Sequence, residues 1–428
     1  MKLSSYMNRD NYKQLLLDIV FILFVIQLLR TFIHEITLVV EDYAGWRGLS
    51  DYYVNYQGGF VRRGLMGEML FFMARNFSIH TEWAIKIFTI SCFLTLCWFF
   101  IKSFMRKGYA LYILPLCFFF GLPHFSNKDY LMICVLVLNL WVYKSSCSSM
   151  IKFLVINASS IFVILSHEVY GIIALPVLCL LLFGEYRNVY KEKSMIKPVV
   201  VTLLFLLPCI LTMFLVARAH GDRETAQIIW DSWMKVFNHS AELNPLSPIG
   251  AIGFDATYNM NQNIGINFLT VSYGVPSWAG WIVTWCAVYY LSINYLSFFS
   301  KQEQNYSPVH KTALSSFFVF QFICFMPLFL VLSCDYGRLS FYLIASSFAV
   351  FLIIPPDQIL NMFPVFFVKC VDRINDGLSK ILPPSGLFIV VLMLLIGMSP
   401  TEFSMGAILK TNVLYNIYAL FMGYYSPV

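Results

Sequence analysis

The sequence predicts an all-α fold, a polytopic bundle of transmembrane helices that forms one integral membrane domain over residues 1–428. Hydrophobic residues make up 59% of the chain, charged residues only 12%, and the mean hydropathy is +0.71, which excludes a soluble globular protein. The basic residues lie mostly in short loops between apolar runs, where they set the orientation of membrane spans. The formal charge of +6 therefore requires no nucleic acid as a partner.

Successive apolar runs predict about eleven spans, and a short aromatic segment at 412–425 leaves a twelfth open. The predicted spans cover residues 15–40, 83–101, 109–122, 130–143, 153–166, a sixth that ends before Arg187, 198–217, 279–299, 312–333, 339–355 and 383–399. Lys2, Arg9 and Lys13 precede the first run, so the N-terminus is expected in the cytoplasm.

Three longer segments connect these spans. Residues 41–82 are expected to form a first external loop, in which the apolar stretch 65–73 is too short to cross the membrane and should be an interfacial helix. Residues 218–278, rich in Asn, Gly, Trp and Tyr, are expected to form a large external loop. Residues 356–382 are expected to be a cytoplasmic loop.

The stretch 51–68 in the first external loop combines aromatic residues, glycines and two adjacent arginines. Glycine lets a backbone approach a ligand closely, and arginine matches phosphate oxygens with a fork of donors. Tyrosine offers a flat face to a sugar ring. We expect Arg62 and Arg63 to bind phosphate and Tyr53 and Tyr56 to bind sugar; the alternative for the arginines is a role as interfacial anchors.

Further ionisable residues fall at the outward ends of predicted spans, where such groups suggest a functional site. They are Lys128 and Asp129, His167 and Glu168, and Asp335 and Arg338. Simpler interpretations are a helix-capping pair, a short hydrated turn and a local ion pair, respectively.

Specific roles follow for these residues if they meet at one site. Lys128 and Arg338 are expected to bind phosphate, and His167 to bind sugar. Asp51, Glu168 and Asp335 are the candidate catalytic carboxylates. A partly buried Glu168 should have a raised pKa and serve as general base on a sugar hydroxyl.

The motifs that the sequence lacks argue against nucleotide-driven chemistry. It contains no P-loop, no Rossmann glycine fingerprint, no zincin motif and no nucleophile elbow. Most of the cysteines lie inside apolar runs, without disulfide or zinc spacing. No cofactor and no metal site is predicted.

Transfer of a glycan from a lipid-linked phosphate donor fits an external, ATP-independent site with arginines and carboxylates, since the leaving phosphate needs cations and the acceptor hydroxyl needs a base.

In its charged first external loop with Gly58–Gly67, its large late external loop and its outward Asp335–Arg338 stretch, the chain resembles Wzy-type O-antigen and capsular polysaccharide polymerases. More broadly, it is similar to GT-C class polyprenyl-dependent glycosyltransferases. The likeness covers the whole chain in architecture but only residues 58–67 and 335–338 in motif. In GT-C transferases the first external loop supplies an acidic residue, which Glu41, Asp42 or Asp51 matches.

The resemblance implies polymerisation of undecaprenyl-pyrophosphate-linked repeat units on the outer face of a bacterial inner membrane. Membrane lipid, a flippase and a chain-length regulator are the further partners expected. One alternative is a GT-C transferase that uses a polyprenyl-phosphate monosaccharide, for which a divalent metal would be expected. Another is a lipid-linked oligosaccharide flippase or transporter, but such proteins place polar groups through the bilayer midplane, where this chain has almost no charge.

Overall fold

The structure is a computed structural model. It describes residues 49–108, 114–118, 127–190, 195–238, 242–272, 275–299, 307–333 and 335–382, together with scattered residues between 15 and 33 and at 240, 388 and 392. Within these residues it is almost wholly helical, apart from a two-stranded antiparallel hairpin of β1 (Val271–Ser272) and β2 (Val275–Pro276). The predicted all-α class is therefore confirmed.

Six of the described helices are long and apolar enough to cross a membrane, which supports an integral membrane protein. They are α3 (Thr81–Arg106), α6 (Ser149–Ser166), α7 (Val169–Tyr190), α8 (Ile196–Arg218), α12 (Pro308–Pro327), which continues through η9 (Leu328–Leu332), and α13 (Tyr336–Ile353). Two more, α5 (Asp129–Lys144) and α11 (Ser277–Phe299), occupy the positions of predicted spans.

The full span count stays a prediction. The runs at 15–40, 109–122, 383–399 and 412–425 lie largely or wholly outside the described residues, which include only the short helix α4 (Leu114–Phe118) from the second of these runs.

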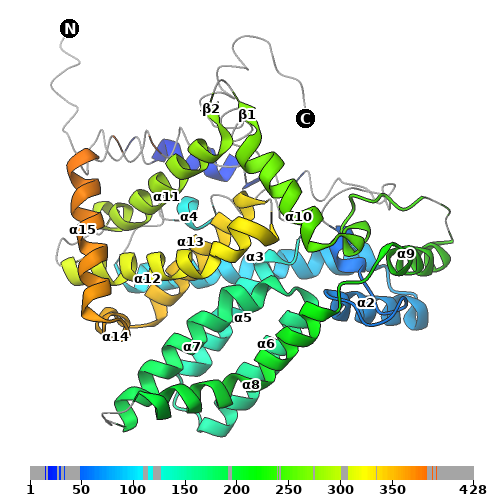
Figure 1. Ribbon diagram of the computed structural model, residues 1–428, viewed down its shortest axis with the longest axis horizontal. Helices are drawn as coiled ribbons and strands as arrows, with labels where there is room; N and C mark the ends of the chain where they lie inside the picture. The colour runs from blue at the N-terminus through cyan, green and yellow to red at the C-terminus, as the bar shows by residue number, and fades with distance from the viewer. Residues whose placement is uncertain are drawn as a thin grey trace.

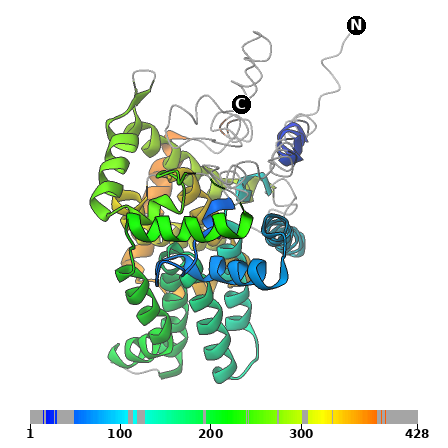
Figure 2. The ribbon, with the colours of Figure 1, turned by 90° about the vertical axis from the view of Figure 1, so that its right-hand side faces the viewer.

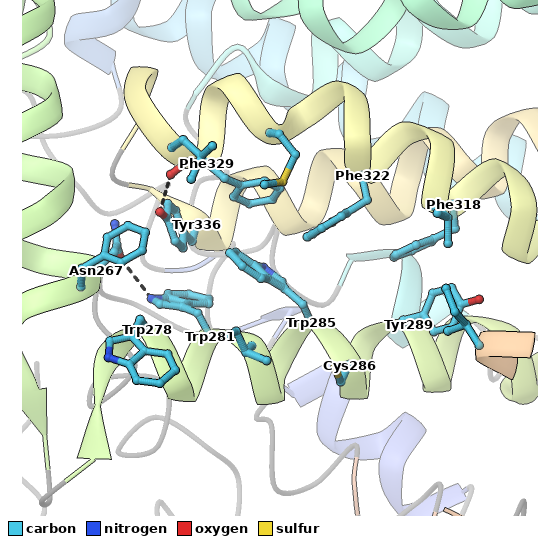
Figure 3. Close-up of a pocket in the computed structure, with 16 residues that line it drawn as sticks. Asn267, Trp278, Trp281, Trp285, Cys286, Tyr289, Phe318, Phe322, Phe329 and Tyr336 are labelled. Atoms are coloured by element: carbon cyan, nitrogen blue, oxygen red, sulfur yellow. Dashed lines mark hydrogen bonds between the residues drawn. The ribbon is translucent and has the colours of Figure 1, made fainter. Parts of the chain in front are cut away.

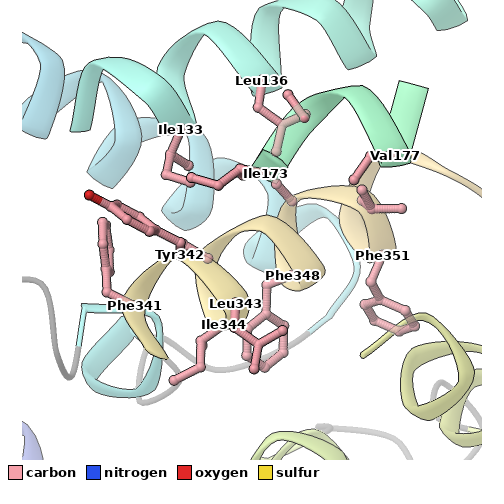
Figure 4. Close-up of a cluster of buried hydrophobic side chains, with 14 of the residues drawn as sticks. Ile133, Leu136, Ile173, Val177, Phe341, Tyr342, Leu343, Ile344, Phe348 and Phe351 are labelled. Atoms are coloured by element: carbon pink, nitrogen blue, oxygen red, sulfur yellow. The ribbon is translucent and has the colours of Figure 1, made fainter. Parts of the chain in front are cut away.

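The helix α13 forms the centre of the molecule and packs against α5, α7 and α12 (Figures 1 and 4). Its Phe348 and Phe351 are buried, as are Ile133 on α5 and Ile173 on α7. A helix that is apolar on all sides is expected to be enclosed by others. The small residues of its segment 345–347 are buried too, which lets neighbouring helices approach closely.

A second apolar core joins the first external segment to the later one. It is formed by η3 (Leu49–Tyr53), α2 (Gly64–Phe77) and α9 (Arg223–Phe237) around the buried indole of Trp233. Figure 2 shows α2 and α9 lying crosswise over one end of the bundle of α5 to α8. The helix predicted at 65–73 is thus present within α2, and its place at the membrane interface stays a prediction.

The segment 218–278, expected as a large loop, is instead a folded lobe. Besides α9 it contains η6 (Gly250–Gly253), α10 (Ala256–Asn263), the π-helical turn η7 (Ile264–Leu269) and the hairpin. Asp222 begins α9 by accepting a hydrogen bond from the Thr225 amide.

Basic side chains gather at the end of the bundle opposite α2 and α9. There Lys107 Nζ donates to the Phe351 carbonyl, and Lys144 Nζ donates to Gln358 on α14 (Pro356–Asn361). The amphipathic helix α15 (Val365–Ile381) lies crosswise at this end (Figure 1). The segment 356–382, expected as a cytoplasmic loop, therefore folds into two helices, and its side of the membrane stays a prediction.

Candidate functional site

The ionisable residues predicted at outward helix ends meet in one group beneath the crosswise layer of α2 and α9. We call this group the polar cluster. Its members are Asp51, Arg62, Arg63, Lys128, Asp129, His167, Glu168, Asp335, Arg338 and Tyr342. They come from η3, the approach to α2, the start of α5, the turn between α6 and α7, and the first turns of α13. Segments far apart in the sequence are thus joined through charged side chains.

Arg63 and Glu168 form the strongest contact on the side of α2. Nε of Arg63 lies 3.0 and 2.9 Å from the two carboxylate oxygens, and its Nη2 lies 2.8 Å from Oε1, a two-pronged arrangement. Arg63 also has a left-handed backbone, with φ of 69°, which is costly for a residue with a Cβ. The contact with Glu168 helps to hold this conformation.

Glu168 differs from the expectation in its acidity. Burial by itself would raise the pKa of this carboxyl, but the charge of Arg63, its hydrogen bonds, and the charges of His167 and Arg62 lower the pKa well below its usual value. The predicted raised pKa is therefore wrong. Both of its oxygens accept hydrogen bonds from Arg63, so Glu168 is better described as the anchor of Arg63 than as a general base.

Lys128 fastens three segments together from a fully buried position. Its Nζ donates to the carbonyls of Asp51 at 2.7 Å, Ser166 at 3.0 Å and Arg63 at 3.4 Å. These three contacts use every proton of the ammonium group. The phosphate-binding role predicted for Lys128 does not fit this geometry.

Arg338 makes its closest contacts with Asp129 rather than with its neighbour in sequence. Nε and Nη2 lie 2.9 and 2.6 Å from the Asp129 oxygens, while Asp335 is 3.8 Å away. The hydroxyl of Tyr342 donates to the same Asp129 carboxylate at 2.5 Å. Asp335 accepts a hydrogen bond from the Arg338 amide, so the predicted catalytic carboxylate caps α13.

Arg62 is the least satisfied cation of the polar cluster. Its Nη2 donates to the Ala251 carbonyl at 3.2 Å, and Nη1 lies 3.9 Å from Glu168. In the described part of the structure its Nε has no hydrogen-bond partner. A guanidinium has five donors, so Arg62 keeps donors for an incoming anion.

Asp51 and His167 are buried, and in the residues that the structure describes neither side chain has a hydrogen-bond partner. The Asp51 carboxylate lies 3.7 Å from Lys128 Nζ and 3.8 Å from Arg63 Nη1. Burial would raise its pKa, but the charges of Lys128, His167 and Arg63 lower it on balance. Burial and the charge of Arg63 lower the pKa of His167 to about 4, so its imidazole is neutral near pH 7.

The aromatic and glycine residues of 51–68 serve internal packing more than expected. The Tyr53 ring is buried 4.7 Å from the Trp233 ring, and therefore offers no open face to a sugar.

A Cβ on Gly64 would lie 2.1 Å from the Tyr56 ring, and one on Gly67 would lie 1.8 Å from the Val54 carbonyl. These two glycines admit protein atoms where a ligand was expected. Tyr56 stays half-buried beside exposed Phe60.

Two participants were missed by the sequence reasoning. Tyr342 carries the only sequence signal, a hydroxyl one helical turn after Arg338. The Ala251 carbonyl offered none, because its contact with Arg62 joins residues 189 positions apart. Glu41 and Asp42, the other acidic residues considered in the first loop, lie outside the described residues.

Within the described segments, no group of three or more His, Cys, Asp or Glu side chains is arranged to hold a metal ion. Metal independence stays a prediction. The chain matches no protein-family model, and the searches of curated proteins and of solved structures return no match.

Proposed function

We propose that this protein is a membrane glycosyltransferase that polymerises glycan repeats carried on polyprenyl pyrophosphate, with the polar cluster as its active site. The observation that supports this most is the convergence of the cluster at the end of the bundle opposite the basic loops. From the distribution of basic residues we expect that end to be the outer face of the membrane. A substrate with a long apolar anchor and a charged head would meet the protein at this boundary.

The cations of the cluster suit the diphosphate of such a substrate. Arg62 has unused donors, and Arg63 and Arg338 are partly exposed at the side chain, 23% and 21%. An anion arriving at Arg62 would lie beside Glu168, whose charge is already neutralised by Arg63. In a site of low dielectric, fixed guanidinium groups stabilise the negative charge that develops on a departing phosphate.

Asp51 and His167 suit the acceptor hydroxyl. Both are buried without hydrogen-bond partners among the described residues, so a sugar hydroxyl could donate to either. In the proposed step the hydroxyl oxygen bonds to the anomeric carbon, its proton passes to the base, and the bond from that carbon to the diphosphate breaks. The diphosphate leaves as an anion beside the arginines. His167, whose ring nitrogens have no hydrogen-bond partner among the described residues, thus replaces Glu168 as the proposed proton acceptor, alongside Asp51.

Deletion of the gene in its host, followed by gel analysis of surface polysaccharide, tests this function. Loss of the ladder with a single repeat retained supports a polymerase, whereas loss of every repeat unit indicates an earlier transferase or a flippase. Complementation with Arg62→Ala should fail to restore the ladder. Lys144→Ala, at the opposite end of the bundle, should restore the ladder, because Lys144 donates to Gln358 and lies far from the polar cluster. A full ladder with Arg62→Ala, Arg63→Ala and Arg338→Ala would remove the proposal.

A further inference from the structure

A large apolar groove lies between α11 and α12, apart from the polar cluster. Its volume is 790 Å³, and aromatic side chains form most of its wall (Figure 3). The lining residues used in the argument are Trp278, Trp281, Cys286, Tyr289, Val319 and Tyr336. This volume lies within the range of pockets that bind small molecules.

Two polar groups of the wall are directed into the protein. Trp281 Nε1 donates to Asn267 at 3.0 Å, and the Tyr336 hydroxyl donates to the Phe329 carbonyl (Figure 3). The groove therefore presents mainly ring faces and aliphatic carbon to an occupant, together with the Trp285 indole nitrogen, which has no hydrogen-bond partner among the described residues. Trp278, Ile282 and Leu330 line it and are also about half exposed, so the groove opens sideways, toward lipid in a membrane-embedded protein.

The groove begins beside the polar cluster. Tyr336 forms part of its wall. Asp335, directly before Tyr336, and Arg338, two residues after it, belong to the polar cluster. Residues two apart on a helix point about 200° apart, so Tyr336 faces the groove while Arg338 faces α5. The two sites are thus separated by the first turn of α13, a helix about 10 Å across.

The groove also has the direction that a membrane anchor needs. Its lining on α11 runs from Trp278 to Tyr289, which is about 16 Å of helix axis, or about half of the hydrocarbon thickness of a bilayer. Trp281, at the cluster end, lies 5.2 Å from the Tyr336 ring. An occupant would therefore extend from the charged surface toward the bilayer centre.

We infer that the groove between α11 and α12 binds the isoprenoid chain of a polyprenyl diphosphate whose head reaches the polar cluster across the first turn of α13. This inference rests on the proposed function for the identity of the head. A single groove with cations at one end suits an anionic head on one chain, whereas a phospholipid carries two chains. Because lipid tails are as apolar as the groove, the gain for the chain comes from packing against rings and not from leaving water.

Photolabelling of the full chain in nanodiscs of phosphatidylethanolamine and phosphatidylglycerol tests the inference. The probe is undecaprenyl diphosphate with a diazirine on its chain, and mass spectrometry locates the labelled peptides. Peptides covering 278–289 and 318–330 should be labelled. Cys286→Trp and Val319→Trp, which narrow the groove from its two sides, should each reduce labelling about tenfold. Val283→Trp is the matched control, because Val283 lies on the same helix, is exposed, and does not line the groove.

Several results would overturn the inference. They are unchanged labelling in both narrowed variants, equal labelling of these peptides by a diazirine phosphatidylglycerol, and crosslinks showing that residues 383–428 of the chain itself fill the groove. The proposed function fails separately. Groove labelling together with a full ladder in the arginine variants would retain the lipid site and remove the transferase, whereas ladder loss in those variants without groove labelling would do the reverse.

Discussion

Arg62 and Arg63 are adjacent in sequence, but the structure predicts opposite consequences for their replacement. Arg62 makes one hydrogen bond to a backbone carbonyl, at 3.2 Å, and a distant contact with Glu168 at 3.9 Å. Its replacement by Ala should lower stability by about 1 kcal/mol, the usual net contribution of one such bond. Loss of activity in Arg62→Ala should therefore come without loss of folded protein.

Arg63→Ala should instead destabilise the protein. It removes the two-pronged contact with Glu168 and leaves that carboxylate without its main partner. Removing one partner of a fully buried pair costs about 3 to 5 kcal/mol, and exposure of this pair reduces the expected loss to about 2 kcal/mol. Arg63→Gly should lose about 1 kcal/mol less than Arg63→Ala, because glycine adopts the left-handed backbone without strain.

Thermal unfolding of the purified variants in one detergent, together with ladder complementation at matched expression, measures both effects. The expected order of melting temperature is wild type, then Arg62→Ala and Arg63→Gly at about the same level, and Arg63→Ala lowest. A larger thermal loss in Arg62→Ala than in Arg63→Ala would refute the division of roles drawn from the contacts. Full complementation by a normally folded Arg62→Ala would refute its role as the anion-binding residue.

Three further predictions follow from single groups. The pKa of His167 is lowered from 6.5 to about 4, so folding favours the neutral imidazole, and about 3 kcal/mol of folding stability is lost as the pH falls from 6.5 toward 4. In His167→Gln the melting temperature should therefore change less over this pH range than in the wild type. An equal fall in both proteins would contradict the prediction. Gly67→Ala should reduce folded protein because its Cβ would meet the Val54 carbonyl, while Gly377→Ala, with open space around it, should not. Tyr342→Phe should cost about 2 kcal/mol in thermal stability by removing a hydrogen bond to the Asp129 carboxylate, and an unchanged melting temperature would count against that bond.

The convergence of the polar cluster could be predicted from sequence, but its pairing could not. Alternating apolar runs and basic loops place Lys128, His167 and Arg338 at the same end of the bundle regardless of how the helices pack. Which charge meets which carboxylate depends on lateral packing, as when Arg338 contacts Asp129 at a separation of 209 residues and not its neighbour Asp335. The local ion pair that the spacing predicted is present, but it is the longer of the two contacts, 3.8 Å against 2.9 Å for Asp129.

Other expectations failed because a residue type has several uses. Glycine permits close approach of any group, and at Gly67 that group is the Val54 carbonyl. A glutamate near a helix end has a raised pKa only if no cation is close, and sequence gave no sign that Arg63 would reach Glu168. The helix α9 of the folded lobe could be predicted in part from the sequence. Asp222 lies three residues before Thr225, the spacing of a helix N-cap, and the apolar Ile229 and Trp233 share one face of the helix.

The pairing inside the polar cluster also bears on how a charged substrate would bind there. Cations held near the edge of an apolar bundle without carboxylates would carry a large desolvation cost, so an active site built on arginines alone would destabilise the empty protein. With Arg63 on Glu168 and Arg338 on Asp129, the empty cluster is close to neutral. A diphosphate can then gain contacts at Arg62 first and share Arg63 afterwards, because Glu168 lies beside both arginines. Under the proposed function Glu168 would tune the release of the product, and Glu168→Gln should bind the diphosphate more tightly and release it more slowly than the wild type.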